Sequence, residues 1–201
     1  MRAMNENIGM MMPIKATPYE HQKRAFAFAC DKFGVFDERL KSRGTALLME
    51  MGTGKTIVSI AIAGCMYQYG KVNRVLVVAP LSILGVWQEE FEKFADFPYS
   101  LTILKGTSAK KKEQLTKLLD EGLQIVVVNY ESAWRLEKEL LAFNADLVIA
   151  DEAHKLKENR TSQSKGMHHI GDKARYKLLL TGTVITNREL DVFSQYRFLN
   201  P

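Results

Sequence analysis

Six short apolar segments recur along this chain of 201 residues, and their pattern predicts the framework of the fold. The segments 75–79 and 125–128 are apolar at every position, whereas a strand with one face in water would alternate apolar and polar residues. Continuous apolar runs of this length are typical of strands covered on both faces. We therefore predict a buried sheet with strands near residues 45–49, 75–79, 101–104, 125–128, 147–150 and 178–180.

Segments with helical periodicity separate these strands. The apolar positions that share a helical face are Ile57, Ile60, Ala61 and Gly64, then Trp87, Phe91 and Phe94, and then Leu115, Leu118 and Leu119. Strands that alternate with helices indicate an α/β fold, in which a mainly parallel central sheet lies between two helical layers as a three-layer sandwich. Ligands of such sheets bind at the carboxyl ends of the strands.

Composition and charge narrow the possible classes only slightly. A hydrophobic content of 46% can build the core of one domain, and a net charge of +5 is compatible with a polyanionic partner without identifying one. Cys30 and Cys65 lie in apolar helical patterns, which favours small buried side chains and a reducing intracellular compartment, cytoplasmic or nuclear. No run approaches the roughly 20 apolar residues of a membrane span, so we expect no membrane partner. We expect the methionine-rich leader 1–14 to be disordered.

A phosphate-binding loop follows the first predicted strand. The residues of this loop are Glu50, Met51, Gly52, Thr53, Gly54, Lys55 and Thr56. Glycines allow backbone N–H groups to close around phosphate oxygens, Lys55 can reach the β- and γ-phosphates, and the Thr56 hydroxyl can bind Mg²⁺. Met49 stands where one form of this loop has a further glycine. The alternative interpretation is an ordinary strand-to-helix turn, but the strand before the loop and the helix after it favour nucleotide binding.

An acid pair follows the strand predicted at 147–150. Two adjacent carboxylates at a buried strand end are unfavourable without a cation, so Asp151 is predicted to hold Mg²⁺ and Glu152 to orient or deprotonate water. The alternative is a charged helix start. His154 is predicted to couple this site to Thr181, Gly182 and Thr183, although capping or packing is also open.

Other conspicuous residues favour ordinary structural roles. Lys110–Lys112 opens an amphipathic helix and is most simply a solvated face. Trp87 and Trp134 are candidates for stacking, but their helical spacing is more typical of core residues. His168 and His169 lack a third ligand at zinc spacing, so no metal is assigned to them.

Several further segments occur in an order that resembles superfamily 2 helicases, and Swi/Snf-type translocases in particular. The matching segments are Thr17–Gln22 (the adenine-reading segment), Ala79–Leu84 with Trp87 and Glu90–Phe91 (motif Ia), Asn129–Glu131 (motif Ib), Asp151–Lys157 (motif II), and Leu180–Thr183 with Asn187, Glu189–Leu190 and Phe198–Pro201 (motif III region). The resemblance covers residues 15–201 and implies the first RecA-like, ATP-binding lobe of a phosphate-loop ATPase. Val184 departs from the family, which usually has proline there.

The resemblance implies several roles. Gln22 would read adenine with Tyr19 as a packing partner, and the reaction would be hydrolysis of ATP with Mg²⁺. The partner would be nucleic acid, and the family favours double-stranded DNA held through its backbone. The predicted contact residues are Pro80, Leu81, Ser82, Gly106, Asn129 and Tyr130, with Lys105, Lys110 and Lys111 nearby. Members of the family continue into a second RecA-like lobe with arginines that complete the ATP site, and we expect that lobe to be absent from this chain.

Two rival functions stay open from the sequence. One is a helicase that separates strands, because the Asp-Glu-Ala-His segment also occurs in such enzymes. The other is an ATP-dependent nucleic-acid-binding module that does not turn over in the isolated lobe. Lys55, Asp151 and Glu152 argue against this module for a complete two-lobed protein.

Overall fold

A computed structural model describes residues 11–37, 39–153, 161–182 and 196–199. Its centre is a sheet of six strands in the order β1-β6-β5-β2-β4-β3, and every pairing between neighbours is parallel. The strands are β1 (Gly44–Leu48), β2 (Arg74–Ala79), β3 (Tyr99–Ile103), β4 (Leu123–Asn129), β5 (Leu147–Ala150) and β6 (Tyr176–Thr181). All six predicted strands are confirmed.

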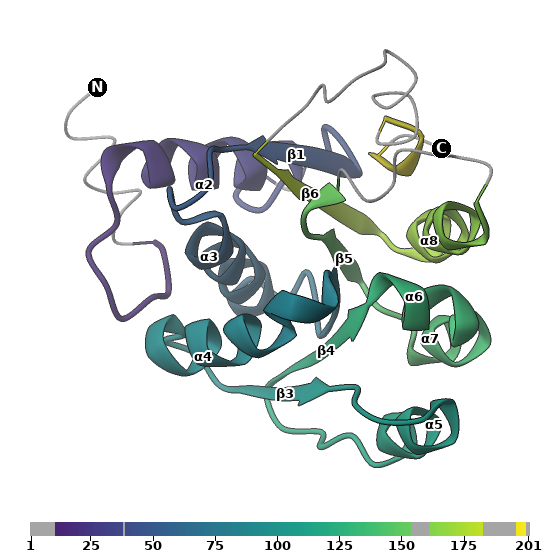
Figure 1. Cartoon of the computed structure of the whole chain (residues 1–201). Helices are drawn as coiled ribbons and strands as arrows, with labels where there is room; N and C mark the ends of the chain where they lie inside the picture. Colours follow the sequence, from purple (N-terminus) through teal and green to yellow (C-terminus); the bar gives the residue numbers. More distant parts are fainter. Residues whose placement is uncertain (1–10, 38, 154–160, 183–195, 200–201) are drawn as a thin grey trace.

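Helices cover both faces of this sheet (Figure 1). Their bounds are α2 (Glu20–Lys32), α3 (Lys55–Gln68), the short 3-10 helix η1 (Leu81–Ile83), α4 (Leu84–Phe94), α5 (Ser108–Thr116), α6 (Tyr130–Arg135), α7 (Glu137–Phe143) and α8 (Ser162–Lys173). Helices α2, α3 and α4 lie on one face, and α5 to α8 lie on the other. The predicted three-layer α/β fold is confirmed.

Strand β2 is apolar from Val75 to Ala79, and the structure shows why. Val75 and Val77 pack into the core beneath α3 and α4, while Leu76 and Val78 pack into the second core beneath α6, α7 and α8. Successive side chains of a strand point to opposite faces, so a strand between two helical layers needs apolar residues at both parities. The strand is therefore central, with β5 on one side and β4 on the other.

Two predictions about the elements need correction. Met12 and Ile14 are buried, the Lys15 N–H donates to the carbonyl of Phe94 at 2.8 Å, and Ile14 forms a β-bridge with Ala95. The packed chain therefore includes residues that we assigned to the disordered leader, because isolated apolar residues without periodicity give no signal of burial. Residues 1–10 lie outside the described residues.

The second correction concerns the helix predicted across Leu115–Leu119. Helix α5 ends at Thr116, and Leu119 is exposed. The chain must turn here to enter β4, and the turn uses Gly122 at φ 68°, where a Cβ atom would come within 2.3 Å of the Pro98 carbonyl oxygen. The tertiary turn therefore overrides the helical spacing of the leucines.

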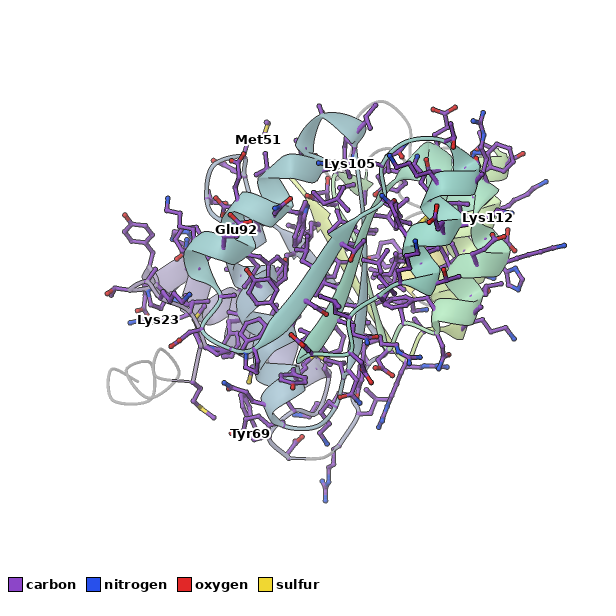
Figure 2. All side chains as sticks on the ribbon, turned by 90° about the horizontal axis from the view of Figure 1, so that it is seen from below. Lys23, Met51, Tyr69, Glu92, Lys105 and Lys112 are labelled. Carbon is purple, nitrogen blue, oxygen red and sulfur yellow. The ribbon has the colours of Figure 1, made fainter. Side chains whose placement is uncertain are left out.

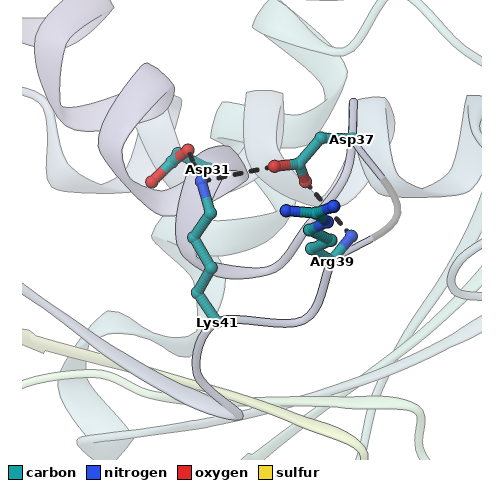
Figure 3. A network of polar contacts seen from close by, with 4 residues as sticks. All are labelled: Asp31, Asp37, Arg39 and Lys41. Carbon is teal, nitrogen blue, oxygen red and sulfur yellow. Dashed lines mark hydrogen bonds and ion pairs between the residues drawn. The ribbon is translucent and has the colours of Figure 1, made fainter.

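The connection between α2 and β1 is organised by polar contacts on the surface (Figure 3). The Lys41 ammonium pairs with Asp31 and lies 3.3 Å from Asp37 Oδ2, while the Arg39 N–H donates to Asp37 Oδ1 at 3.2 Å. The hydrogen bond from the Arg39 backbone lowers the pKa of Asp37, and the bond to Asp31 raises the pKa of Lys41. Because these groups are exposed, the network orders the loop more than it stabilises the fold.

Within the described residues, no helix combines the length and apolar character needed to cross a membrane. The two ends of the sheet differ in what they present. Figure 2 shows the labelled Met51 and Lys105 at one end of the molecule and Tyr69 at the opposite end. Met51 follows β1 and Lys105 follows β3, so the first end is the carboxyl edge of the parallel sheet. Among the described residues, the phosphate loop, the acid pair and the segments that follow β2, β3 and β4 lie at that edge.

Candidate functional site

The predicted phosphate loop connects the end of β1 to the start of α3, and its glycines adopt backbone conformations that other residues rarely reach. Gly52 has φ 78° and Gly54 has φ 91°. Open space surrounds the position of a Cβ atom on Gly52, whereas a Cβ on Gly54 would lie 2.4 Å from Nε2 of Gln22. Gly52 therefore serves the turn and leaves its surface open, while Gly54 also permits a close approach between the loop and α2.

The Lys55 side chain folds back over this loop. Its ammonium group donates to the carbonyl oxygens of Met49 at 3.0 Å and Glu50 at 3.2 Å, and only 9% of the residue is exposed. A Cβ atom on Gly182 would lie 3.6 Å from the same nitrogen. The loop carbonyls therefore keep the positive charge of Lys55 close to the N-terminus of α3, where the helix dipole also favours anions.

The acid pair stands at the end of β5. Asp151 is buried, with its Oδ2 atom accepting a hydrogen bond from Nε1 of Trp87 at 3.0 Å and its Oδ1 atom accepting one from the Glu152 N–H at 2.8 Å. The Asp151 carbonyl accepts a further bond from the Tyr130 hydroxyl at 2.7 Å. Besides the neighbouring strands of the sheet, three elements hold Asp151 in place. They are α4, α6 and the turn after β5.

Electrostatics at the acid pair favour a cation. Burial raises the pKa of the Asp151 carboxyl, although the bond from Trp87 and the charge of Lys55 act in the opposite direction. Burial, followed by the negative charges of Asp151 and Glu152, raises the pKa of Tyr130 well above its ordinary value. Glu152 has φ 49°, a left-handed conformation that costs free energy for a side chain with a Cβ atom. The turn is thus strained at the residue that we predicted to act on water.

The structure brings both halves of the predicted site together. One cavity of about 840 Å³ is lined by residues of the phosphate loop, of the acid pair, of the segment before α2 and of α4. These residues are Ala16, Thr17, Pro18, Tyr19, Gln22, Met51, Gly52, Gly54, Lys55, Thr56, Ile57, Ile83, Val86, Trp87, Glu90, Phe94, Asp151 and Glu152. A volume of this size is within the range of small-ligand sites.

The segment predicted to read adenine attaches directly to the phosphate loop. Gln22 is buried, its Oε1 atom accepts from the Tyr19 N–H at 2.9 Å, and its Nε2 atom donates to the Thr53 carbonyl at 3.1 Å. A carboxamide has two N–H donors and two oxygen lone pairs, so each end of Gln22 keeps the capacity for another bond. Tyr19 is 70% exposed and stacks on His21 with ring centroids 5.8 Å apart. Tyr19 therefore presents an aromatic surface at the rim of the cavity.

Strand β6 connects the predicted coupling segment to the phosphate loop. Leu48 pairs with Thr181, and the Met49 N–H donates to the Thr181 carbonyl at 3.2 Å. Thr181 is buried, and Gly182 lies against Met49 and Lys55. Two residues of the predicted coupling set thus contact the loop, while His154, Thr183 and also Val184 lie outside the described residues.

The residues predicted to contact nucleic acid follow the neighbouring strands β2, β4 and β3 at the same edge. Pro80, Leu81 and Ser82 follow β2, and Leu81 is 72% exposed. Gly106 follows β3 at φ 91°, and a Cβ there would lie 3.1 Å from the flexible Lys110 side chain. The adjacent strand order gathers these segments, which the sequence alone does not place side by side.

The predicted contact residues at the end of β4 are less accessible than the sequence suggested. Asn129 and Tyr130 are both buried, and the Tyr130 hydroxyl is engaged with Asp151. The Tyr130 side chain is therefore directed toward Asp151 rather than toward the molecular surface. A buried tyrosine hydroxyl needs a hydrogen-bond partner, and the sequence did not reveal that this partner is the carbonyl of Asp151.

Trp87 is the functional residue whose role the sequence analysis missed. Its helical spacing correctly indicated burial, and only 1% of the side chain is exposed. A buried indole N–H also requires an acceptor, and this acceptor is the acid at position 151, 64 residues further along the chain. Trp134 is half-buried and packs against Gly166 of α8. A Cβ atom added to Gly166 would lie 2.7 Å from the Cβ atom of Trp134.

The fold and the site together define a class: a RecA-like α/β lobe with a phosphate loop and an acid pair in one cavity. The family model described as "SNF2-related domain" matches residues 11–201, so the chain belongs to the SNF2-related family. A solved structure from Sulfolobus solfataricus, the SWI2/SNF2 ATPase core in complex with dsDNA, superposes with a TM-score of 0.77 at 29% identity. That match covers 94% of this chain and 37% of the archaeal chain.

Curated relatives agree with this assignment. The chain is 30% identical over 185 residues to the mouse DNA excision repair protein ERCC-6-like, a match that covers 90% of this chain and 14% of the relative. It is also 30% identical over 153 residues to the Arabidopsis thaliana ISWI chromatin-remodeling complex ATPase CHR11, covering 76% of this chain and 14% of the relative. The chain therefore spans a minor part of the length of each of these proteins.

Proposed function

We propose that this chain is the ATP-binding lobe of a nucleic-acid-dependent ATPase, which hydrolyses ATP to ADP and phosphate and translocates on double-stranded DNA together with a second RecA-like lobe. The observation that carries the proposal is the single cavity that contains Lys55, Thr56, Asp151 and Glu152. The family, and the archaeal relative solved with double-stranded DNA, support the nucleic-acid partner. An intracellular location, cytoplasmic or nuclear, stays a prediction.

The donor set at this cavity fits Mg²⁺. Asp151 is a buried carboxylate whose pKa is raised by burial, so a nearby cation would relieve an unfavourable buried charge. The half-buried Thr56 lines the same cavity and adds a hydroxyl oxygen. Mg²⁺ prefers oxygen ligands and is commonly held by one or two protein groups together with substrate phosphates. We therefore assign Thr56 and Asp151 as its protein ligands; when bound, the ion would neutralise charge on the phosphate oxygens.

The remaining residues have distinct tasks in this proposal. The backbone N–H groups of Met51–Thr56 and the Lys55 ammonium bind the phosphates. Gln22 uses its second donor and acceptor to read the adenine edge, with Tyr19 packing beside it. Glu152 orients the attacking water and accepts its proton. Thr181 and Gly182 touch the loop and would transmit a change in nucleotide state, with His154 and Thr183 as the other predicted members of this coupling set.

The loss of the Lys55 ammonium tests the phosphate-loop assignment. Lys55→Ala should abolish ATP binding, because the substitution removes the positive charge at the loop while leaving the backbone in place. Titration with a fluorescent ATP analogue measures the affinity, and Lys173→Ala is the matched control, since Lys173 is an exposed lysine in the last turn of α8. An unchanged affinity of the Lys55 variant would show that the cavity does not bind the triphosphate through this loop.

One observation favours the rival of a binding module without turnover, for the isolated lobe. Among the described residues, no arginine lines the cavity. An arginine finger contributes roughly 10³–10⁵ in rate in phosphoryl-transfer enzymes. This chain alone should therefore bind ATP yet hydrolyse it very slowly, and duplex DNA should stimulate it little. A phosphate-release assay with and without DNA decides the matter, and robust DNA-stimulated turnover by these 201 residues would contradict the need for a second lobe.

A further inference from the structure

The indole of Trp87 joins helix α4 to the acid pair through one buried hydrogen bond. Its Nε1 atom lies 3.0 Å from Oδ2 of Asp151, and both residues are almost completely buried. The Phe91 ring packs beside it, with ring centroids 6.2 Å apart, and restricts the orientation of the indole. Trp87 therefore contributes a rigid donor at a fixed point, in contrast to a long flexible side chain.

This donor determines which acceptor sites of the carboxylate stay available. An ionised carboxylate has about four lone-pair sites. The Trp87 indole occupies one on Oδ2, and the Glu152 N–H occupies one on Oδ1. With one donor on each oxygen, rotation of the carboxylate about its bond to Cβ would break both bonds. The remaining lone pairs are thus presented in one orientation.

Helix α4 also connects this bond to the other half of the carboxyl edge. The helix directly follows η1 and the Pro80–Ser82 segment, which we predicted to contact nucleic acid. The residues Ile83, Val86 and Glu90 of η1 and α4 line the same cavity as Asp151. A displacement of α4 would therefore move the indole and, with it, the carboxylate.

We propose that Trp87 is the positioning residue of Asp151: its indole N–H holds the carboxylate in the orientation that receives the magnesium ion of the bound nucleotide. This inference rests on the proposed ATP-binding function. It assigns to motif Ia a task inside the ATP site, whereas the sequence analysis considered Trp87 only as a stacking candidate or a core residue. Outer-shell partners of metal ligands commonly change metal affinity by about 10–100-fold when they are removed.

Replacement of the indole by a ring without a donor tests the proposal. The affinity of the 201-residue chain for a fluorescent ADP analogue is measured at saturating Mg²⁺ and in EDTA, and the ratio of the two affinities gives the enhancement by Mg²⁺. Trp87→Phe keeps an aromatic ring but removes the N–H, so the affinity at saturating Mg²⁺ should fall about 10-fold more than the affinity in EDTA. Trp134→Phe is the matched control, because it removes the other tryptophan of the chain.

Two outcomes of this titration would overturn the proposal. If Trp87→Phe keeps the full enhancement by Mg²⁺, the indole does not position the metal ligand. If the affinity falls equally with and without Mg²⁺, the substitution has damaged the packing of α4 and the bond has no specific role. In the Asp151→Asn background, where the metal ligand is already lost, Trp87→Phe should cause no further loss of the enhancement, because the indole acts through Asp151.

A second measurement leaves Trp87 in place and does not depend on nucleotide binding. The ¹H–¹⁵N spectrum of the chain should contain two indole N–H signals, assigned with the Trp87 and Trp134 variants. Asp151→Asn should shift the Trp87 signal and leave the Trp134 signal unmoved. An unshifted Trp87 signal would overturn the contact itself. If the unsubstituted chain binds no nucleotide, the proposed function fails, and the indole shift still decides whether Trp87 holds Asp151.

Discussion

The two halves of the sheet's carboxyl edge are built differently. At the ends of β1, β6 and β5, hydrogen bonds join separate segments to one another: Lys55 to Met49 and Glu50, Gln22 to Thr53, Met49 to Thr181, and Trp87 to Asp151. At the ends of β2 and β3, Leu81 projects into solvent, and the atoms nearest to a Cβ on Gly106 would be those of the flexible Lys110 side chain.

This difference agrees with two kinds of ligand. A compact triphosphate requires charges and N–H groups preorganised at fixed positions, because their value depends on geometry. A nucleic-acid backbone is a repeating polyanion, and accessible amides and mobile lysines can follow it without reading sequence. The end of β4 combines features of both halves. Tyr130 directly follows this strand, among the segments predicted to contact nucleic acid, but its hydroxyl donates to the carbonyl of Asp151.

Two glycines with the same φ angle, one in each half, allow the two halves to be compared directly. Gly54 and Gly106 both have φ 91°, so alanine costs each about 1–2 kcal/mol of conformational strain. Gly54→Ala should also push Gln22 away from the loop and lower nucleotide affinity roughly 10-fold, the equivalent of about 1.4 kcal/mol and the upper range for one lost hydrogen bond. Gly106→Ala should leave that affinity unchanged. Equal effects of both variants in the fluorescent-nucleotide titration would remove the distinction between the halves.

The Tyr130 hydroxyl tests whether β4 belongs to the nucleotide half. Tyr130→Phe removes the bond to the Asp151 carbonyl and should lower the free energy of unfolding by about 1 kcal/mol, the usual contribution of one such bond. DNA affinity, measured by fluorescence anisotropy, should not change. A selective loss of DNA binding at unaltered stability would instead place the Tyr130 side chain on the nucleic-acid surface.

The smallest effect is expected on the open half. Lys105 is exposed beside Gly106. Lys105→Ala should weaken binding to all DNA sequences by a similar factor. It should also reduce the slope of log affinity against log salt concentration by the equivalent of about one phosphate contact. ATP affinity should stay the same, because the residue lies outside the cavity. The check is a series of anisotropy titrations at several salt concentrations, with Lys173→Ala as the control. An unaltered salt slope would exclude Lys105 from the contact.

Local pattern was a good guide wherever a residue's role depends on its own neighbours in the chain. The strands around Val75–Val78 and Ile125–Val128 were predicted from continuous apolar runs, and the phosphate loop from its glycines and Lys55. The helix predicted through Leu119 was wrong, because the turn at Gly122 and its contact with Pro98 depend on segments that meet only in space.

The sequence by itself determined the layers, the strand number and the residues that gather at the carboxyl edge, because side-chain periodicity and glycine-rich turns act over a few residues. Only the tertiary structure decided the strand order, which separates β1, β6 and β5 from β2, β4 and β3. It also decided that Trp87 and Tyr130 both turn toward Asp151. A buried donor must find an acceptor, but the identity of that acceptor is set by packing between distant segments.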